Sequence, residues 1–470
     1  MVAQLISVLA YPFLSRLYSP TEMGLATFFF GISSILSIFL TGRYELAIIL
    51  PKSDSAASNI ALLAIFFASV GFIASFLIIF AFYPHLIAFG KNAQLTEWLY
   101  IVPIAAFLIS YCQIMRYLGT RFREYQKLAI SSVLQPLIYV SIAILLGVIA
   151  YMNDGLILSR ILSYFGSTII IAWMFCDKIQ KLIQNFSIKL MWENGLRYKQ
   201  FLFCNVPYSA LGAFSKEFII FSFVAFGYSE SAGLYALARN ILFIPISFLS
   251  STLGQVFYQE SATTTDTSKL EQLVLQLINS IIIFGVPGVI FFVIWACEIF
   301  SFCFGEVWWG AGTYAAIFMP AAFLSLFTSW PERLYEVAQK QYIALTIQVI
   351  FDSLSVFLLW FLLTFGFSLL KCILFYTILN CVYQLVYLIN IFKISNFDML
   401  KLLSGGSKIL ILTLSFTILL YFPCLVFTSP LAQFMGGMFI LLGYYLFIVS
   451  LNIRPAQRFN FEFLLIDQKY

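Results

Sequence analysis

Six basic side chains lie inside or at the ends of strongly apolar segments of this sequence. They are Arg16, Arg43, Arg160, Lys216, Arg239 and Lys371. An Arg or Lys at the centre of a bilayer costs roughly 2.5–3.5 kcal/mol on insertion scales, so such residues normally face a bundle interior or a wet cavity. Arg and Lys are also the side chains that bind phosphate groups, and Arg does so through a planar bidentate fork. The chemistry that these residues could perform is therefore phosphate binding.

Three carboxylates occur in the same apolar segments. Glu217 follows Lys216 near the middle of one segment, Asp352 lies in the middle of another, and Glu45 lies two residues after Arg43. A carboxyl group at such a position is either neutral and hydrogen-bonded or part of a proton or sodium site. Glu45, Glu217 and Asp352 are therefore candidates for ion coupling, and their depth favours Glu217 and Asp352.

The depth of each cation bears on whether it is a membrane anchor or part of a site. Lys216 lies almost at the midpoint of residues 201–226, which indicates a water-filled cavity or a buried structural pair with another helix. Arg43 lies roughly 12 Å from the end of its segment at 1.5 Å per residue, and it is either an anchor or a site. Taken singly, the cations nearer the segment ends are interpreted as anchors: Arg16, Arg160, Arg239 and Lys371.

Arg43 and Glu45 are separated by a single residue, Tyr44. On a helix, residues two apart project about 200° apart around the axis. We therefore expect that Arg43 and Glu45 do not form a simple pair and that each needs its own partner or its own route to water.

The elements that position these residues follow from the composition. Hydrophobic residues make up 62% of the 470 residues and charged residues only 10%, with a mean hydropathy of +0.96. Soluble domains average roughly 25% charged residues. No polar extramembrane domain and no pattern of a cleavable signal peptide is recognised. The sequence therefore predicts an all-α, polytopic transmembrane helix bundle whose function lies within the bilayer.

Apolar runs of the length that crosses a ~30 Å hydrocarbon core give the expected spans. About fourteen are found, near residues 1–18, 24–50, 55–82, 98–119, 127–150, 155–176, 201–226, 232–257, 272–296, 311–331, 342–366, 368–392, 406–427 and 431–452. When the connections alternate between the two sides, most of the 26 Lys and Arg residues fall on one side. By the positive-inside rule, this side is cytoplasmic. A multi-pass protein with both termini in the cytoplasm is therefore expected.

Two weak internal repeats suggest a duplicated architecture. The segment 18–26 resembles 228–236, and 123–130 resembles 339–345. Six spans separate the copies in each case, and an even number keeps the two halves in the same orientation. This is the parallel-repeat arrangement found in secondary transporters, in which the substrate site lies between the halves near the midplane.

The longest polar connection divides the chain. Residues 177–200 are basic and helically patterned, which predicts an amphipathic cytoplasmic linker helix on the membrane surface. The expected organisation is an N-terminal lobe of six spans (1–176), the linker (177–200), a C-terminal lobe of six spans (201–392), and two appended spans with a cytoplasmic tail (393–470).

Several motifs resemble one transporter family. The N-terminal pattern consists of LSRLYSP at 14–20, Gly24 and RYELAIILP at 43–51. Later motifs are RFREY at 121–125 with Gln135, and GLYALAR at 233–239 with Pro245 and QVF at 255–257. Together they resemble Wzx-type O-antigen flippases of the polysaccharide transporter family in the MOP superfamily, which also holds MATE drug exporters and lipid II flippases. The resemblance covers residues 1–260 well and the remainder by topology only.

The resemblance implies two six-helix lobes in a MATE-like V around a cationic cavity. It implies a flippase that moves a polyprenyl (undecaprenyl)-pyrophosphate-linked glycan repeat unit from the cytoplasmic to the periplasmic leaflet of a bacterial inner membrane, for O-antigen or another surface polysaccharide. Ion-coupled alternating access is expected, driven by a proton or sodium gradient. Carried over by position, Arg16 and Arg43 would line the cavity in the first lobe, and Lys216 and Arg239 in the second. Membrane lipids and the polysaccharide polymerase machinery are the further partners considered.

Two other classes remain open at this stage. A MATE-like multidrug exporter shares the fold, but organic cations favour a cavity dominated by acids. A membrane-embedded polysaccharide polymerase or acyltransferase would usually show a large external loop or a buried catalytic histidine, whereas the single histidine, His85, is expected at the external interface. The eight cysteines show no C-x-x-C spacing. No catalytic residue, metal site, cofactor or nucleic-acid partner is therefore expected.

Overall fold

The computed structural model describes residues 2–89, 98–149, 154–263, 267–338 and 340–453. Within these ranges the regular structure is helical and no strand is present. The chain divides into two compact units. The first comprises residues 1–245, 300–315 and 345–379, and the second 246–299, 316–344 and 380–470. The predicted tail, 454–470, lies outside the described residues.

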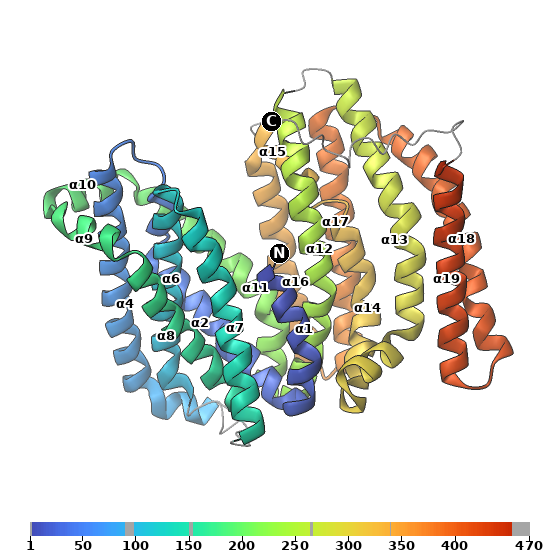
Figure 1. Cartoon of the computed structure of the whole chain (residues 1–470), viewed down its shortest axis with the longest axis horizontal. Helices are drawn as coiled ribbons and strands as arrows, with labels where there is room; N and C mark the ends of the chain where they lie inside the picture. The colour runs from blue at the N-terminus through green and yellow to red at the C-terminus, as the bar shows by residue number, and fades with distance from the viewer. Residues whose placement is uncertain (1, 90–97, 150–153, 264–266, 339, 454–470) are drawn as a thin grey trace. The chain divides into compact units, whose positions relative to one another are not determined.

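The helices follow one another along the whole described chain (Figure 1). They are α1 (Val2–Leu17), α2 (Pro20–Thr41), α3 (Tyr44–Ala47), α4 (Asp54–Phe89), η1 (Leu99–Ile101), α6 (Val102–Arg121), α7 (Tyr125–Ile149), α8 (Gly155–Met174), α9 (Cys176–Gln184), α10 (Ile188–Arg197), η2 (Phe201–Asn205), α11 (Val206–Ala225), α12 (Ser229–Thr263), α13 (Thr267–Phe304), η3 (Glu306–Trp308), α14 (Trp309–Ser325), η4 (Pro331–Arg333), α15 (Leu334–Val337), α16 (Gln341–Thr364), α17 (Leu369–Ser395), α18 (Met399–Val426) and α19 (Pro430–Ile453).

Most of the predicted spans correspond to long helices. Among the described residues, twelve helices are long and apolar enough to cross a membrane, which confirms a multi-pass membrane protein. The other two predicted spans correspond to α1 and α18. Helix α1 has only 16 residues, and in α18 the stretch recognised as apolar is Phe416–Val426. The total of fourteen spans therefore stays a prediction.

Local sequence signals explain where α2 begins and ends. Ser19 and Glu22 form a capping box at its start, and Pro20 occupies the first turn, where a missing N–H costs nothing. At the other end, Gly42 and Arg43 both adopt left-handed backbone conformations, with φ of 56° and 59°. Glycine tolerates this conformation and stops a helix. The predicted continuous span 24–50 is therefore wrong beyond Thr41, where α2 gives way to the short helix α3.

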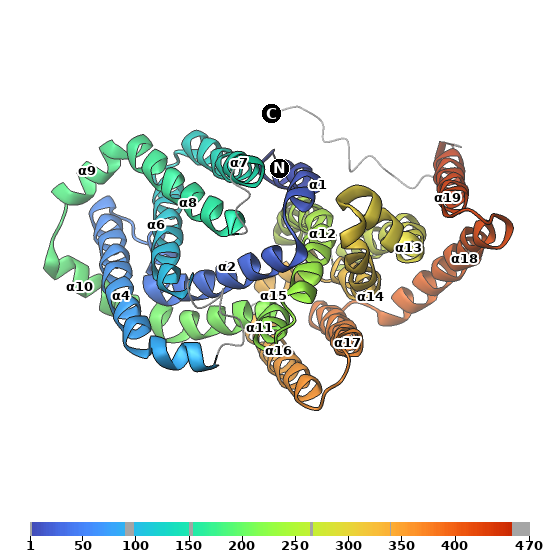
Figure 2. The same cartoon turned by 90° about the horizontal axis from the view of Figure 1, so that it is seen from below.

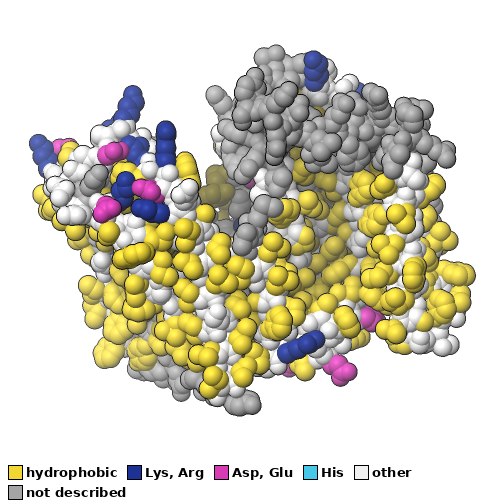
Figure 3. Space-filling model, viewed as in Figure 1, with side chains coloured by type: hydrophobic (Ala, Val, Ile, Leu, Met, Phe, Trp, Pro, Cys, Tyr) yellow, Lys and Arg dark blue, Asp and Glu magenta, His cyan; other side chains and the backbone are white. Residues whose placement is uncertain are grey.

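Small residues allow close packing in the first unit. Ala61, Ala64 and Ala68 on α4 and Ala106 on α6 belong to one buried apolar cluster with Leu118. Alanine on a membrane helix allows backbones to approach because it projects only a methyl group. Figure 3 shows apolar side chains over the sides of the helices, with Lys and Arg gathered near the end of the first unit that carries α9 and α10.

The two copies of the first sequence repeat contact each other. Gly24 is in the first turns of α2 and Gly233 in the first turns of α12, and a Cβ atom built on Gly233 would lie 1.7 Å from the carbonyl oxygen of Pro20. A Cβ atom on Gly24 would lie 2.2 Å from the carbonyl oxygen of Ser229. The two helices therefore cross in near backbone contact, which only glycine permits. In the second repeat, Gln339 lies outside the described residues.

The predicted single linker helix is two helices, α9 and α10. Asn59, fully buried on α4, determines the joint between them: its Nδ2 donates to the carbonyl of Asn185 (2.9 Å), and its Oδ1 accepts from the N–H of Ser187 (2.9 Å). The Tyr44 hydroxyl donates to the carbonyl of Gly195 on α10 (3.0 Å). Figure 2 shows both short helices beside α4.

In the second unit, α18 and α19 pack against the kinked helix α13. Non-helical angles at Trp295 mark the kink in α13, and Trp295 is buried together with Phe291 and Leu420. On α19, the hydroxyl of Tyr444 donates to the carbonyl of Ile283 (3.0 Å). Because α13 carries Pro287, this region has carbonyls that lack an intrahelical donor.

Candidate functional site

The first unit brings Arg239 on α12 together with Glu217 on α11. One terminal nitrogen of the guanidinium, Nη2, donates to both carboxylate oxygens of Glu217 at 3.1 Å. The other, Nη1, donates to the backbone carbonyl of Lys216 at 2.8 Å. The predicted cavity cation Arg239 and the predicted coupling acid Glu217 therefore form a charge-neutral pair.

Lys216 differs from its neighbour. Its side chain is exposed, and among the described residues no carboxylate lies within 4.0 Å of its ammonium group. Since Glu217 is held by Arg239, the three residues together carry one net positive charge, and that charge is on Lys216. Lys216 also interacts electrostatically with Asp352 on α16.

Asp352 on α16 lies against the same stretch of α11. The hydroxyl of Ser215 donates to its Oδ1 (3.0 Å), and Nε2 of Gln348 donates to its Oδ2 (3.3 Å). The hydroxyl of Tyr208 in turn donates to Oε1 of Gln348 (2.8 Å). Asp352 is therefore a half-buried acid held by neutral donors.

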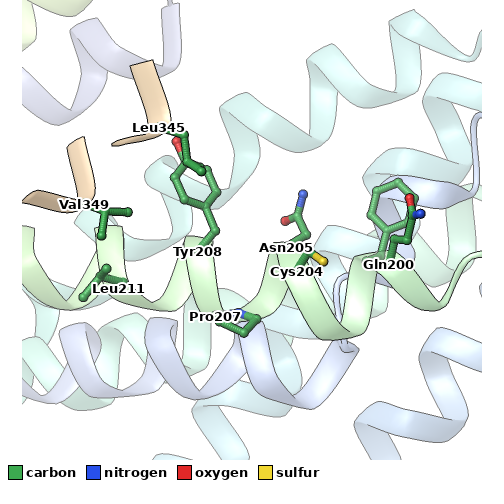
Figure 4. A pocket seen from close by; sticks show the side chains of 9 residues that line it. Gln200, Cys204, Asn205, Pro207, Tyr208, Leu211, Leu345 and Val349 are labelled. Atoms are coloured by element: carbon green, nitrogen blue, oxygen red, sulfur yellow. The ribbon is translucent and has the colours of Figure 1, made fainter. Parts of the chain in front are cut away.

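A cavity of about 570 Å³ opens at the start of α11. Gln200, Asn205 and Tyr208 are the polar members of its lining, with apolar side chains from α11 and α16 (Figure 4). The chain forms a π-helical turn, η2, at this position. Such turns occur frequently at functional sites. Since Tyr208 belongs both to the cavity lining and to the hydrogen-bonded chain to Asp352, the acid is connected to this space.

Arg43 and Glu45 form the pair that helical geometry excludes. Nη1 of Arg43 lies 3.3 Å from Oε1 of Glu45, which is fully buried. The expectation that they cannot pair is wrong because Gly42 and Arg43 are left-handed and helical spacing does not apply there. Arg43 lies away from the Arg239–Glu217 pair. A Cβ atom built on Gly31 would lie 3.4 Å from Cγ of Glu217, so Glu217 packs beside Gly31. From Gly31, α2 continues for about 15 Å to Thr41, two residues before Arg43.

Arg16 is exposed in the last turn of α1. The four predicted cavity cations lie on different elements of the first unit: Arg16 on α1, Arg43 before α3, Lys216 on α11 and Arg239 on α12. Lys216 and Arg239 are joined through the hydrogen bond from the Arg239 guanidinium to the Lys216 carbonyl.

Arg160, which its place in the sequence indicates to be an anchor, lies among aromatic rings. Its guanidinium carbon lies 3.8 Å from the ring centroid of Tyr139 on α7 and 5.6 Å from that of Phe30 on α2. A signal was present: Tyr164 lies four residues after Arg160 and so on the same helix face. The ring at 3.8 Å comes from a different helix, and sequence spacing cannot reveal it.

Among the described residues, no group of three or more His, Cys, Asp or Glu side chains could hold a metal ion. The side chain of His85 lies outside the described part of the chain.

Residues 13–313 match a family model described as polysaccharide biosynthesis protein. No curated protein matches the sequence. The structure is similar to the lipid II flippase MurJ in an inward closed conformation, with a TM-score of 0.73, 15% identity, and coverage of 96% of this chain and 99% of that chain.

A second similar structure is the inward-facing conformation of a multidrug resistance MATE family transporter of the MOP superfamily. Its TM-score is 0.63 at 16% identity, and the match covers 84% of this chain and 95% of that one. At these identities the likeness shows a common fold. The family match spans more than half of the sequence, and with this fold the chain belongs to the polysaccharide biosynthesis protein family.

Proposed function

We propose that this protein is a flippase that moves a polyprenyl-pyrophosphate-linked glycan repeat unit from the cytoplasmic to the periplasmic leaflet. The family match supports a role in polysaccharide biosynthesis, and the likeness to flippase and transporter folds supports translocation as the activity. O-antigen or another surface polysaccharide of a bacterial inner membrane is the proposed pathway, with both termini cytoplasmic and the polymerase machinery as the acceptor.

The observation that carries the proposal is the exposed ammonium of Lys216 in the middle of an apolar helix. A cation at this depth is costly without a polar environment. A glycan head with many hydroxyl groups also needs a polar path across hydrocarbon, because burying unsatisfied hydroxyls there is unfavourable. One polar path that admits the pyrophosphate and the sugars together would satisfy both requirements.

The acids take different roles in this mechanism. Glu217 is the counter-ion of Arg239, so an incoming pyrophosphate would compete with it for the guanidinium. Asp352 has only neutral donors and can take up a proton without breaking an ion pair. We assign proton coupling to Asp352 first and to Glu217 second. Glu45, fully buried beside Arg43, is the third candidate.

The test replaces Lys216 in a strain that depends on this chain for its surface polysaccharide. Lys216→Ala is expected to abolish surface polysaccharide while the protein reaches the membrane at the normal level. Lys189→Ala is the matched control, because Lys189 on α10 is an exposed cation outside the predicted spans. Normal surface polysaccharide with well-expressed Lys216→Ala would refute the role of Lys216.

The alternative function is cation-coupled export of organic cations. The observation that favours it is Asp352, an acid whose hydrogen-bond donors are neutral and that is connected to the cavity at α11. Binding of organic cations that is lost in Asp352→Asn, together with unchanged surface polysaccharide, would support the exporter.

A further inference from the structure

Arg160 has an environment that differs from those of the other half-buried arginines. Arg43 is paired with Glu45, Arg121 with Asp54 and Arg239 with Glu217. Among the described residues, no carboxylate lies within 4.0 Å of Arg160, which projects from α8 only a few residues from buried Ser159 and Ser163. The first unit therefore keeps a half-buried guanidinium whose charge is not balanced by an acid.

Aromatic rings surround this guanidinium. Tyr139 lies under it at 3.8 Å, close enough for a cation–π contact, and Phe30 lies at 5.6 Å. Arg160 also makes a side-chain hydrogen bond to Tyr139. A guanidinium has five N–H donors, so donors remain that can bind a planar anion.

Polar groups adjoin the rings. The hydroxyl of Tyr11 on α1 accepts a hydrogen bond from Nδ2 of Asn240 (3.0 Å), and Asn240 follows Arg239 along α12. Tyr11 interacts electrostatically with both Arg160 and Arg239. Tyr11 therefore connects the Arg160 site to the Arg239–Glu217 pair in the same unit.

We propose that Arg160 and Tyr139 form a binding site for an oxyanion of the transported lipid, and that this oxyanion is the carboxylate of an acidic sugar. A pyrophosphate carries at least two negative charges, whereas one unpaired guanidinium offers a single positive charge. Aromatic rings bind the apolar faces of sugars, and the amide and hydroxyl of Asn240 and Tyr11 match sugar hydroxyl groups. The inference rests on the proposed function, because the ligand is part of the lipid-linked glycan.

The test is mass spectrometry of the lipid that co-purifies with the protein, compared with binding of added undecaprenyl pyrophosphate, which has no sugar. The wild-type protein is expected to carry a glycan with a carboxylate sugar. Arg160→Gln is expected to reduce glycan-lipid occupancy about tenfold, the equivalent of roughly 1.4 kcal/mol for a lost charged hydrogen bond, and to leave undecaprenyl pyrophosphate binding unchanged.

Two further variants separate binding from folding. Arg160→Lys keeps the charge but loses the planar fork, so it is expected to retain only part of the glycan binding. Arg197→Gln is the matched control: Arg197 lies over the ring of Tyr198 (5.7 Å) on the exposed face of α10. It is expected to bind like the wild type.

The outcomes distinguish this inference from the proposed function. A neutral glycan on the wild-type protein, or equal glycan occupancy in Arg160→Gln, overturns the acidic-sugar site and leaves the flippase proposal standing. Loss of undecaprenyl pyrophosphate binding in Arg160→Gln reassigns the site to pyrophosphate and also overturns the inference. A wild-type protein that binds no polyprenyl lipid contradicts both proposals.

Discussion

The Arg43–Glu45 pair is enclosed but incompletely hydrogen-bonded. Glu45 has no exposed surface, and its second carboxylate oxygen, Oε2, is buried without a hydrogen-bond partner, as is Nε of Arg43. Breaking a buried ion pair from one side leaves an uncompensated charge, which is more costly than removing both charges. The two residues should therefore be energetically coupled.

Arg43→Gln is expected to lower the free energy of unfolding by about 3 kcal/mol, because it leaves Glu45 buried and unpaired. The double variant Arg43→Gln/Glu45→Gln is expected to recover part of this loss. Unfolding in detergent, followed in all four proteins of the mutant cycle, measures the coupling. Strictly additive effects would show that the two side chains do not stabilise each other.

Glu124, in the connection between α6 and α7, is the acid for which a pH effect is expected. A hydrogen bond from Lys178 holds the pKa of Glu124 below its ordinary value of 4.5, and the nearby charge of Lys127 acts in the same direction. Because the folded pKa is lowered, the stabilisation is present above the unfolded pKa and is lost as the pH falls through the folded value.

Glu124→Gln is therefore expected to lower the thermal midpoint slightly at neutral pH, and the difference from the wild type should vanish as the pH falls well below 4.5. The effect is small because exposed ion pairs are screened by water. Glu193→Gln is the control, since Glu193 and Lys189 are 4.0 Å apart on exposed α10. A difference that grows in acid would contradict the assigned pair.

At the level of residues, the sequence predicts which side chains are unusual better than it predicts their partners. Lys216 and Glu217 on α11 do lie close to Asp352 on α16, which accepts a hydrogen bond from Ser215 on α11. The partner of Arg43 could not be predicted, because it depends on a left-handed backbone at Gly42 and Arg43. The ring under Arg160 comes from α7, and no sequence spacing relates Arg160 to Tyr139.

At the level of elements, the crossing of α2 and α12 depends on two glycines. A side chain at Gly233 would overlap the backbone of Pro20, so the helices would have to separate. Small residues at such crossings stabilise membrane helix pairs through close backbone contact. The two copies of the first sequence repeat thus provide the surfaces that meet.

Gly233→Ala is expected to destabilise the protein by about 1–3 kcal/mol, the range for overpacking a tight contact. The matched control is Gly443→Ala on α19, where an added Cβ atom meets no other atom within 4 Å. This control should be neutral or slightly stabilising, because alanine favours helix more than glycine does. Thermal unfolding measures both, and equal midpoints would show that the crossing is not tight.

The long helices were predictable because an apolar run of sufficient length has few other stable forms in a membrane. The predicted helix boundaries are wrong at positions where a polar contact determines the path of the backbone. The linker divides into α9 and α10 because Asn59 on a distant helix holds the joint between them. Such a contact between segments far apart in the sequence leaves no periodic pattern.

At the level of the whole molecule, the chain shares its family with polysaccharide biosynthesis proteins and its fold with the lipid II flippase MurJ. The parallel repeats predicted from the sequence stay a prediction. The division into lobes 1–176 and 201–392 stays a prediction, as does the number of spans. The polar path, the coupling acid and the pyrophosphate ligand belong to one proposed mechanism, which a bound substrate would test together.

The most direct measurement is native mass spectrometry of the protein purified gently from its own membranes, alongside Lys216→Ala. The flippase proposal predicts a co-purifying polyprenyl-diphosphate glycan on the wild-type protein and its loss from Lys216→Ala, with both proteins equally folded. A wild-type protein without such a lipid that instead shifts in mass with added organic cations would contradict the flippase and favour the exporter.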